Sequence, residues 1–483
     1  NGNIWGMGKN AKKVRVRINA TESILEDPEI MNAYERKCIA RCREFTPDIK
    51  VMTYIHNQIC VDADDDKYEE ARMIDARGRR MFFGSGEAAK IFLPTLDNAY
   101  GRDFLKLVDW YFDNFDLDGI YLDEVSHCNS RFYGGDAYWD GVTVELDEQF
   151  NIKRKLSFVS LLKLDLTLAF FDQVINQRGK LLVGNFSPET RSERKFKFPR
   201  FEETYNARWI ALSHLYTPIQ LGDMLTYANT PKDMAADQRM ALMRGALYYH
   251  YVGNTGCPSL TSKMYPFTPQ EIHAGWLVGE ERILTAVSGE FGWPGKDEPV
   301  NVYVYNELGR LVPGYPYETT ATPRGRVIRL ELEKDHCAAI VRAALDLPSD
   351  EGKLIDATSS YARDSGTISA TACAGGIEVR HSGKRDWSVG KFEPFAVKTG
   401  DVLAYTCTVV CAENSEKTGT LSPSVILRDA KDNVIDWAFA STGGRATGVM
   451  SAIFAIPHGA VTAEPRIVGT GPFAGRVTGV SFA

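Results

Sequence analysis

Residues 117–125 read LDGIYLDEV, and this run decides how the surrounding chain is organised. Side chains in a β-strand alternate between two faces, so Ile120 and Leu122 share one face while Tyr121 and Asp123 share the other. We expect the apolar pair to pack against helices. Asp123 then lies on the opposite face, at the carboxyl end of the strand.

Other short apolar runs surround this strand and alternate with helical patterns from about residue 14 to 290. The predicted strands are residues 14–18, 50–56, 90–95, 119–125, 181–186 and 198–203. Parallel strands need crossover connections of helix length, so this alternation predicts an α/β fold with a parallel sheet.

Helix signals fall between these strands. Residues 104–112 have the apolar spacing of one helical face, directly before the strand at 119. A long helix is expected from about Asn151 to Gly179, a residue type that commonly follows a helix end. Two further helix starts are predicted at 230–233 and 268–271, where Thr precedes Pro and an acidic residue.

The chain of 483 residues carries 56 Lys and Arg against 63 Asp and Glu, a net charge of −7 without long blocks of one sign. Binding to nucleic acid or to a membrane surface by charge needs a basic face, which the sequence lacks. Lys163, Asp165 and Asp172 interrupt the most apolar stretch, residues 156–175, so we expect a buried helix there rather than a membrane span. The nine cysteines lack zinc-site spacing, and we expect core thiols and no metal.

The run 117–125 resembles glycoside hydrolases with a (β/α)8 barrel, in particular alpha-amylase-like and alpha-galactosidase-like enzymes whose fourth strand ends in an Asp nucleophile. The shared pattern is DG, a hydrophobic residue, two further residues and Asp, which ends here at Asp123. The resemblance implies a (β/α)8 TIM barrel over residues 1–285, with its active site at the carboxyl ends of the strands. It also implies that Asp123 is the nucleophile and that Asp118 has a structural role at the strand entry.

Hydrolysis of a glycoside needs a second carboxyl group, which protonates the leaving oxygen. Glu202 and Glu203 lie on the sixth predicted strand, where the alpha-galactosidase-like enzymes have their acid/base, and either could face the pocket. Glu124 follows Asp123 directly, but alternation is expected to turn it to the other face. The nucleophile resemblance favours a retaining mechanism, with the two carboxyl groups about 5–5.5 Å apart.

Polar and aromatic residues near the other predicted strand ends suit a sugar, which has hydroxyl edges and apolar faces. The candidate substrate-binding residues are Tyr54, His56, Asn57, Asp97, Asn98, Tyr121, His127, Asn185, Tyr205 and Trp209. For His56 the alternative is a buried histidine with satisfied hydrogen bonds, and for Trp209 it is a packing residue.

Beyond residue 283 alternating strands are separated by Gly and Pro turns, which predicts a small all-β domain over residues 286–350. Residues 366–483 predict a separate β-sandwich. This last part resembles the jelly-roll carbohydrate-binding modules of polysaccharide-degrading enzymes, through Trp387, Trp437 and a closing strand. Both Trp residues are either core residues or sugar platforms, and the resemblance allows for a structural calcium ion.

The sequence therefore predicts a multi-domain glycoside hydrolase that acts on an oligosaccharide or polysaccharide and requires no cofactor for catalysis. By the same class argument we expect a secreted, periplasmic or cell-surface microbial protein, without nucleic-acid partners or membrane insertion. The competing hypotheses are a non-catalytic glycan-binding protein on the same barrel, and a transglycosylase or lyase on the same fold.

Overall fold

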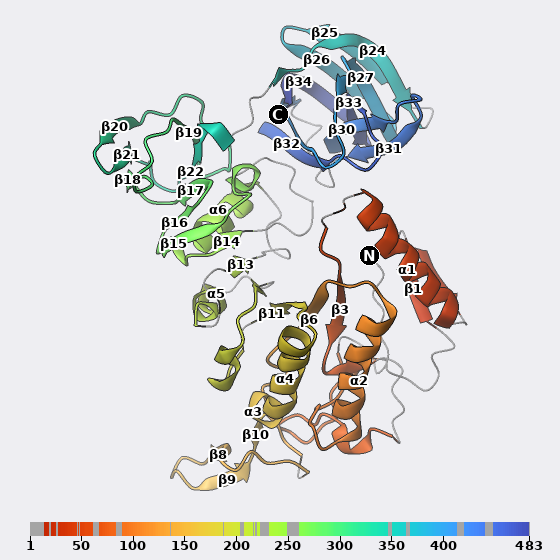
Figure 1. The fold of residues 1–483 in the computed structure, drawn as a ribbon, viewed down its shortest axis with the longest axis vertical. Helices are drawn as coiled ribbons and strands as arrows, with labels where there is room; N and C mark the ends of the chain where they lie inside the picture. Colours follow the sequence, from red (N-terminus) through yellow and green to blue (C-terminus); the bar gives the residue numbers. More distant parts are fainter. Residues whose placement is uncertain are drawn as a thin grey trace. The chain divides into compact units, whose positions relative to one another are not determined.

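The computed structural model describes most of the chain (Figure 1). The described residues are 14–18, 21–25, 28–45, 47, 49–60, 67–83, 89–135, 137–186, 188–202, 207–215, 217, 220–222, 231–248, 260–345, 350–363, 368–412, 420–439 and 448–482. The chain divides into two units, and each is described by itself. The first unit comprises Asn1–Arg43, Asp48–Glu202 and Leu212–Gln220, and the second comprises Glu44–Pro47, Glu203–Ala211 and Leu221–Ala483.

Four parallel strands form the central sheet of the first unit, in the order β12-β11-β6-β3. They are β3 Met52–His56, β6 Gly119–Asp123, β11 Leu181–Asn185 and β12 Arg200–Glu202. The register places His56 beside Asp123 and Gly184 beside Leu122. The carboxyl ends of the strands therefore meet at one edge of the sheet.

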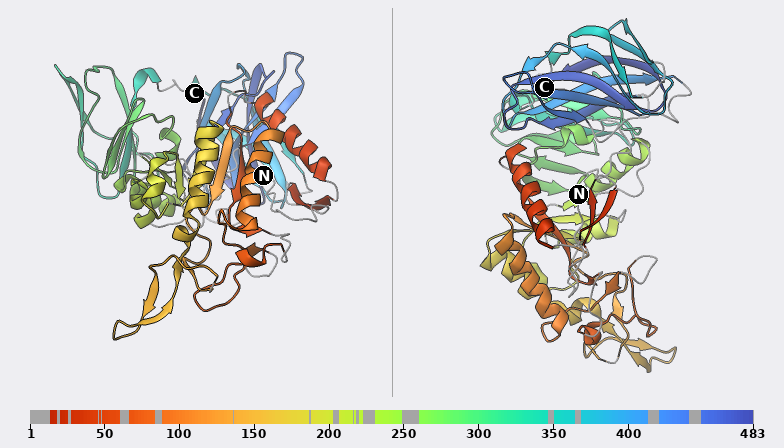
Figure 2. Two further views of the ribbon diagram at one scale, coloured as in Figure 1. Left: turned by 60° about the horizontal axis from the view of Figure 1, so that its bottom comes forward. Right: turned by 90° about the vertical axis from the view of Figure 1, so that its right-hand side faces the viewer.

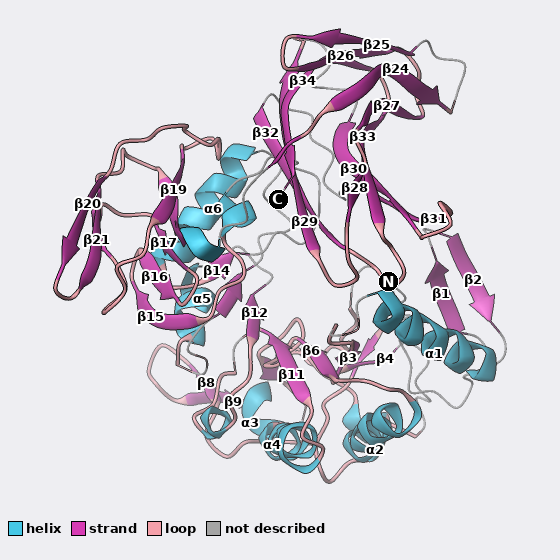
Figure 3. Cartoon of the chain, turned by 45° about the horizontal axis from the view of Figure 1, so that its top comes forward, coloured by secondary structure: helices cyan, strands magenta, loops and turns pink. Residues whose placement is uncertain are grey.

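Helices α2 Ala99–Asn114 and α4 Leu164–Phe171 pack on one face of this sheet (Figure 3). Ile120 and Leu122 are fully buried there, in a core that they share with Phe104 and Phe170 of the helices. The predicted burial of Ile120 and Leu122 against helices is confirmed. The helical face at 104–112 and the strands near 50, 119, 181 and 198 are confirmed as well.

Two predicted parallel strands are antiparallel instead. The run 14–18 forms β1 Val14–Ile18, which pairs antiparallel with β2 Thr21–Leu25, because two intervening residues are far too few for a crossover. The run 90–95 contributes only β5 Lys90–Ile91, antiparallel to β4 Ile59–Cys60. Asp123 therefore lies on the second parallel strand of the described chain, not the fourth. The described strands do not show a closed eight-stranded barrel, which stays a prediction.

The helix expected from Asn151 begins later. It starts with α3 Val159–Leu162, continues through α4 and ends in a π-helical turn, Asp172–Gln177, before Gly179 with its positive φ of 61°. The Asp147 carboxylate accepts the N–H groups of Gln149 and Asn151 at 2.9 and 2.8 Å, which forms a turn instead of a helix.

That turn joins β8 Val144–Leu146 to β9 Ile152–Lys155. The hairpin projects beyond the ends of α2 and α4 in both views of Figure 2. At the base of the hairpin, β7 Phe132–Tyr133 pairs with β10 Ser157–Phe158. A further long helix, α1 Pro28–Phe45, lies earlier in the chain.

In the second unit, α6 Pro231–Met243 begins at the predicted proline. The start predicted at 268–271 is wrong, because β15 Pro269–His273 pairs there with β16 Trp276–Gly279. The N–H and hydroxyl of Thr268 donate to the Glu281 carboxylate, each at 2.7 Å, so this threonine does not cap a helix. The strand β14 Leu247–Tyr248 is parallel to β13 Gln220–Gly222. Both β13 and the helix α5 Ala207–Ser213 include residues assigned to each of the two units.

Two antiparallel sheets follow. The first has the order β15-β16-β17-β22-β19 and the second β18-β21-β20. The strands not yet given are β17 Arg282–Thr285, β18 Gly289–Phe291, β19 Val300–Tyr305, β20 Glu318–Thr322, β21 Gly325–Leu330 and β22 Cys337–Arg342. Three strands of the first sheet thus precede residue 286, and the domain boundaries drawn from the sequence remain predictions.

The last part is a β-sandwich of two six-stranded sheets around one apolar core. One sheet contains β25 Ile368–Cys373, β26 Gly376–His381, β34 Phe473–Phe482, β29 Val402–Cys411, β32 Gly448–Ala455 and β23 Asp350–Glu351. The other contains β24 Leu354–Ala362, β27 Asp386–Phe392, β33 Thr462–Thr470, β30 Thr420–Arg428, β31 Val434–Phe439 and β28 Phe395–Ala396. Trp387 is a core residue at 2% exposure, whereas Trp437 is 42% exposed.

Candidate active site

Asp123 lies where three neighbouring strands end. Its Oδ2 accepts a hydrogen bond from the Tyr54 hydroxyl of β3, and its Oδ1 accepts one from Asn185 Nδ2 of β11 at 2.7 Å. The backbone N–H of Glu124 also donates to Oδ1, at 2.9 Å. Donors from the ends of three strands thus hold the half-buried carboxylate in one orientation.

Aromatic packing holds the Tyr54 hydroxyl in place. The rings of Tyr54 and Tyr121 are stacked, with centroids 5.7 Å apart and planes 17° apart. Phe201 of β12 meets Tyr121 edge to face at 6.3 Å. Tyr121 therefore supports Tyr54 from the side, and the predicted pair Tyr54 and Tyr121 belongs to the same cluster as Asp123.

Glu124 does not point away from Asp123's face, contrary to the sequence prediction. Its φ is +46°, so the strand alternation ends at Asp123. The carboxylate turns back to His56, whose Nε2 lies 2.9 Å from Glu124 Oε2. His56 and Asp123 are paired in the sheet register, so their side chains lie on the same face of the sheet. The contact with His56 therefore places the Glu124 carboxylate on the face that also contains Asp123.

The hydrogen bonds of His56 fix its tautomer. Nδ1 accepts the backbone N–H groups of Gln58 and Ile59 at 3.0 and 3.2 Å, so the ring proton is on Nε2 and is donated to Glu124. Burial opposes ionisation of Glu124, but the hydrogen bonds from His56 and from the Cys128 thiol outweigh it and lower its pKa. His56 is buried, and its ring is satisfied on both nitrogens.

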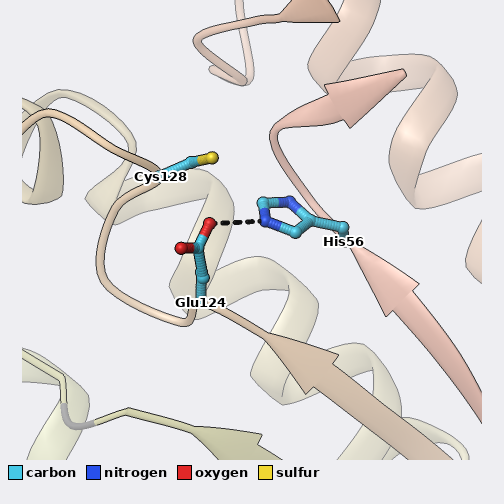
Figure 4. Close-up of side chains that lie close together, drawn as sticks. All are labelled: His56, Glu124 and Cys128. Atoms are coloured by element: carbon cyan, nitrogen blue, oxygen red, sulfur yellow. Dashed lines mark hydrogen bonds and ion pairs between the residues drawn. The ribbon is translucent and has the colours of Figure 1, made fainter. Parts of the chain in front are cut away.

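His56, Glu124 and Cys128 have ligand atoms within 4.8 Å of one another (Figure 4). This donor set does not suit a metal ion. A histidine bound to a metal through Nε2 carries its proton on Nδ1 and donates it to an acceptor, whereas Nδ1 here faces two N–H donors. Burial and the neighbouring Glu124 carboxylate also raise the pKa of the Cys128 thiol, which disfavours the thiolate that a metal needs.

The buried Lys163 binds polar groups that follow the ends of β3 and β6. Lys163 Nζ donates to the backbone oxygen of Val125 at 2.8 Å and to Asn57 Oδ1 and Gln58 Oε1, each at 3.4 Å. Burial lowers its pKa to about 8, although nearby carboxylates oppose this shift. Asn57 is thus a partner of Lys163 in the core, not a residue shown to face a ligand.

His127 lies beside a fixed carboxylate, with its Nδ1 3.3 Å from Glu189 Oε2. Glu189 also accepts hydrogen bonds from Arg131 and, at 2.7 Å, from Ser160. Burial raises the pKa of Glu189, but these donors more than compensate and lower it to about 2. Glu189 is therefore ionised, accepts hydrogen bonds from its neighbours and is poorly suited to donate a proton.

The other predicted site residues have different placements. Asn98 is the N-cap of α2 and accepts the N–H of Gly101 at 2.8 Å, while the neighbouring Asp97 is exposed. Asn98 is thus a capping residue, and no described contact joins either residue to Asp123. Trp209 is half-buried on α5. Glu203, Tyr205 and the side chain of Glu202 lie outside the described residues.

No family model and no curated protein matches this chain. Among solved structures, a cycloisomaltooligosaccharide glucanotransferase from Paenibacillus sp., complexed with cycloisomaltoheptaose, aligns over 97% of this chain and 51% of its own, with 7% identity and a TM-score of 0.28. The xylan-binding domain CBM22-1 from Paenibacillus barcinonensis aligns over 28% of this chain and 91% of its own, with 11% identity and a TM-score of 0.19.

The enzymatically active domain of tailspike protein 4 from bacteriophage CBA120 aligns over 26% of this chain, with 14% identity and a TM-score of 0.18. The alignment spans only 18% of the tailspike chain and about half, 51%, of the glucanotransferase. Because these TM-scores are low, the function proposed below rests on the geometry of the site.

Sequence reasoning missed three residues of this cluster. Glu124, Lys163 and Glu189 interact with His56, Val125 and His127 across segments far apart in the chain. The sequence does contain a signal for Lys163, because a lysine within an apolar run is either exposed at the surface or buried with a hydrogen-bonding partner. Among the described helices, none is long and apolar enough to cross a membrane.

Proposed function

We propose that this chain is a retaining glycoside hydrolase acting on an oligosaccharide or polysaccharide, with Asp123 as the nucleophile. The observation that carries the proposal is the Asp123 carboxylate, held by Tyr54 and Asn185 where three parallel strands end. Such strand ends are where α/β sheets and (β/α)8 barrels form their sites. The barrel itself is part of this proposal.

The two oxygens of Asp123 differ in their partners. Oδ1 accepts from Asn185 and from the Glu124 N–H, while Oδ2 accepts from Tyr54 alone among the described residues. Oδ2 thus keeps a lone pair for attack on the anomeric carbon. Glu202 or Glu203 would protonate the departing glycosidic oxygen, then take a proton from the water that cleaves the glycosyl–Asp123 ester.

The test compares Asp123→Ala and Asp123→Asn with the wild type on a panel of aryl glycosides and polysaccharides. We expect turnover to fall about a thousandfold or more. Azide should restore activity to Asp123→Ala and give a glycosyl azide with the anomeric configuration inverted. Asp118→Asn is the matched control, because Asp118 accepts the Val51 N–H at 2.8 Å at the opposite end of the same strand.

Covalent trapping with 2-deoxy-2-fluoro glycosyl fluorides should label the peptide that contains Asp123. A label on another carboxylate, or full turnover by Asp123→Asn, would exclude Asp123 as nucleophile. Binding that persists in Asp123→Asn, with no turnover by the wild type, would show a glycan-binding protein. Unsaturated products would show a lyase, and products longer than the substrate would show a transglycosylase.

We propose further that the reaction needs no metal or other cofactor, so a chelator should leave turnover unchanged. The His56, Glu124 and Cys128 cluster supports this, since its hydrogen bonds conflict with metal binding through His56 Nε2. Loss of activity with the chelator and recovery with one divalent cation would contradict this part of the proposal.

A further inference from the structure

We propose that Glu124 is a positioning residue for Asp123, held in place by His56. This inference rests on the proposed function of Asp123. It starts from the backbone of Glu124, which has a φ of +46° although the residue is not a glycine. Residues with a Cβ disfavour this left-handed region, so other contacts must maintain it.

In this conformation Glu124 makes two contacts. The Glu124 N–H donates to Asp123 Oδ1 at 2.9 Å, while its side chain turns back to His56 Nε2, also at 2.9 Å. The first contact fixes the Asp123 carboxylate. The second holds the peptide in the conformation that makes the first contact.

His56 is suited to be the fixed end of this arrangement (Figure 4). Its side chain is 2% exposed, and its Nδ1 is held by the N–H groups of Gln58 and Ile59. A turn of the ring would break both bonds inside the core. The backbone after β3 therefore orients His56, His56 orients Glu124, and Glu124 orients Asp123.

The test uses three substitutions in the full chain. Glu124→Ala and Glu124→Gly both remove the bond to His56, but Glu124→Gly also removes the steric cost of the left-handed backbone. We expect kcat to fall about 100-fold in both variants with little change in KM, since misplacing a reacting group by about 1 Å has that effect. Glu124→Gln keeps an oxygen acceptor for His56 and should stay within roughly fivefold of the wild type.

A matched control separates backbone strain from positioning. Asn129 also has a positive φ, 56°, in the same loop, but it is exposed and does not bond to Asp123. Asn129→Ala should leave kcat unchanged. If Glu124→Gly equals the wild type, or if Asn129→Ala loses as much activity as Glu124→Ala, the positioning role is wrong.

A second readout does not depend on turnover. The chain has eight histidines, so NMR of the ring nitrogens and their protons in labelled protein can resolve His56. We expect a hydrogen-bonded Nε2–H signal in the wild type and in Glu124→Gln, and its loss in Glu124→Ala. A proton on Nδ1 would overturn the inference even if the wild type is active. If the Nε2–H signals are as expected but the wild type hydrolyses no glycoside, the proposed function is wrong, whereas the hydrogen bond between His56 and Glu124 is confirmed.

Discussion

The buried ammonium group of Lys163 makes the polar core behind Asp123 sensitive to pH. Lys163 is 1% exposed, and burial lowers its pKa from 10.5 to about 8. Between these two pH values the unfolded chain binds a proton that the native protein lacks. The stability contributed by this group therefore rises with pH across that window, because deprotonation relieves the cost of a buried charge.

The size of the effect follows from the shift. A change from 10.5 to about 8 corresponds to about 3 kcal/mol at about 1.4 kcal/mol per pKa unit. Lys163→Met removes the titrating group, so the stability of the wild type relative to this variant should rise by about 3 kcal/mol from pH 8 to pH 10.5. The loss of the bond to Val125 shifts the whole difference curve but does not change its slope.

Cys128 gives a local readout, because its backbone N–H and Lys163 both donate to Gln58 Oε1. Modification of Cys128 by a methanethiosulfonate reagent in increasing urea, followed by peptide mass spectrometry, measures the free energy of opening this core. The matched control is Lys180→Met, which removes a lysine bonded to the Leu117 carbonyl at the other end of β6 and should keep the wild-type increment. Parallel pH curves for the wild type and Lys163→Met would refute the reasoning.

Three further predictions concern single residues. Glu189→Gln should cost about 3 kcal/mol of unfolding free energy at pH 7. Since the native pKa of about 2 lies below the ordinary 4.5, this difference should be lost between pH 4.5 and pH 2, and urea denaturation of both proteins measures it. Gly469→Ala should destabilise the β-sandwich by about 3 kcal/mol or more, seen as a lower Tm, because the new Cβ would lie 2.1 Å from Trp387 and 2.3 Å from the Thr420 carbonyl oxygen. Iodoacetamide should modify the exposed Cys42 of the native protein but not Cys128, because Cys128 is buried and burial raises the pKa of its thiol. Equal labelling rates for the two cysteines would contradict the buried position of Cys128.

The sequence by itself determined the local features of this site. Alternation in LDGIYLDEV placed Ile120 and Leu122 against helices and Asp123 on the opposite face, at the strand's end. The helical spacing at 104–112 and the Pro231 helix start were equally local. Each of these features depends on residues within a few positions of one another, which a periodic pattern can reveal.

Only the tertiary structure decided what surrounds Asp123. Tyr54, Asp123 and Asn185 meet because their strands pair in one register, and that register depends on a core built from the whole sheet. The capping signal at 268–271 was misleading, because this segment pairs with β16 and forms a strand instead of a helix. The turn of Glu124 toward His56 joins segments 68 residues apart, so no pattern within residues 117–125 could distinguish it from simple alternation.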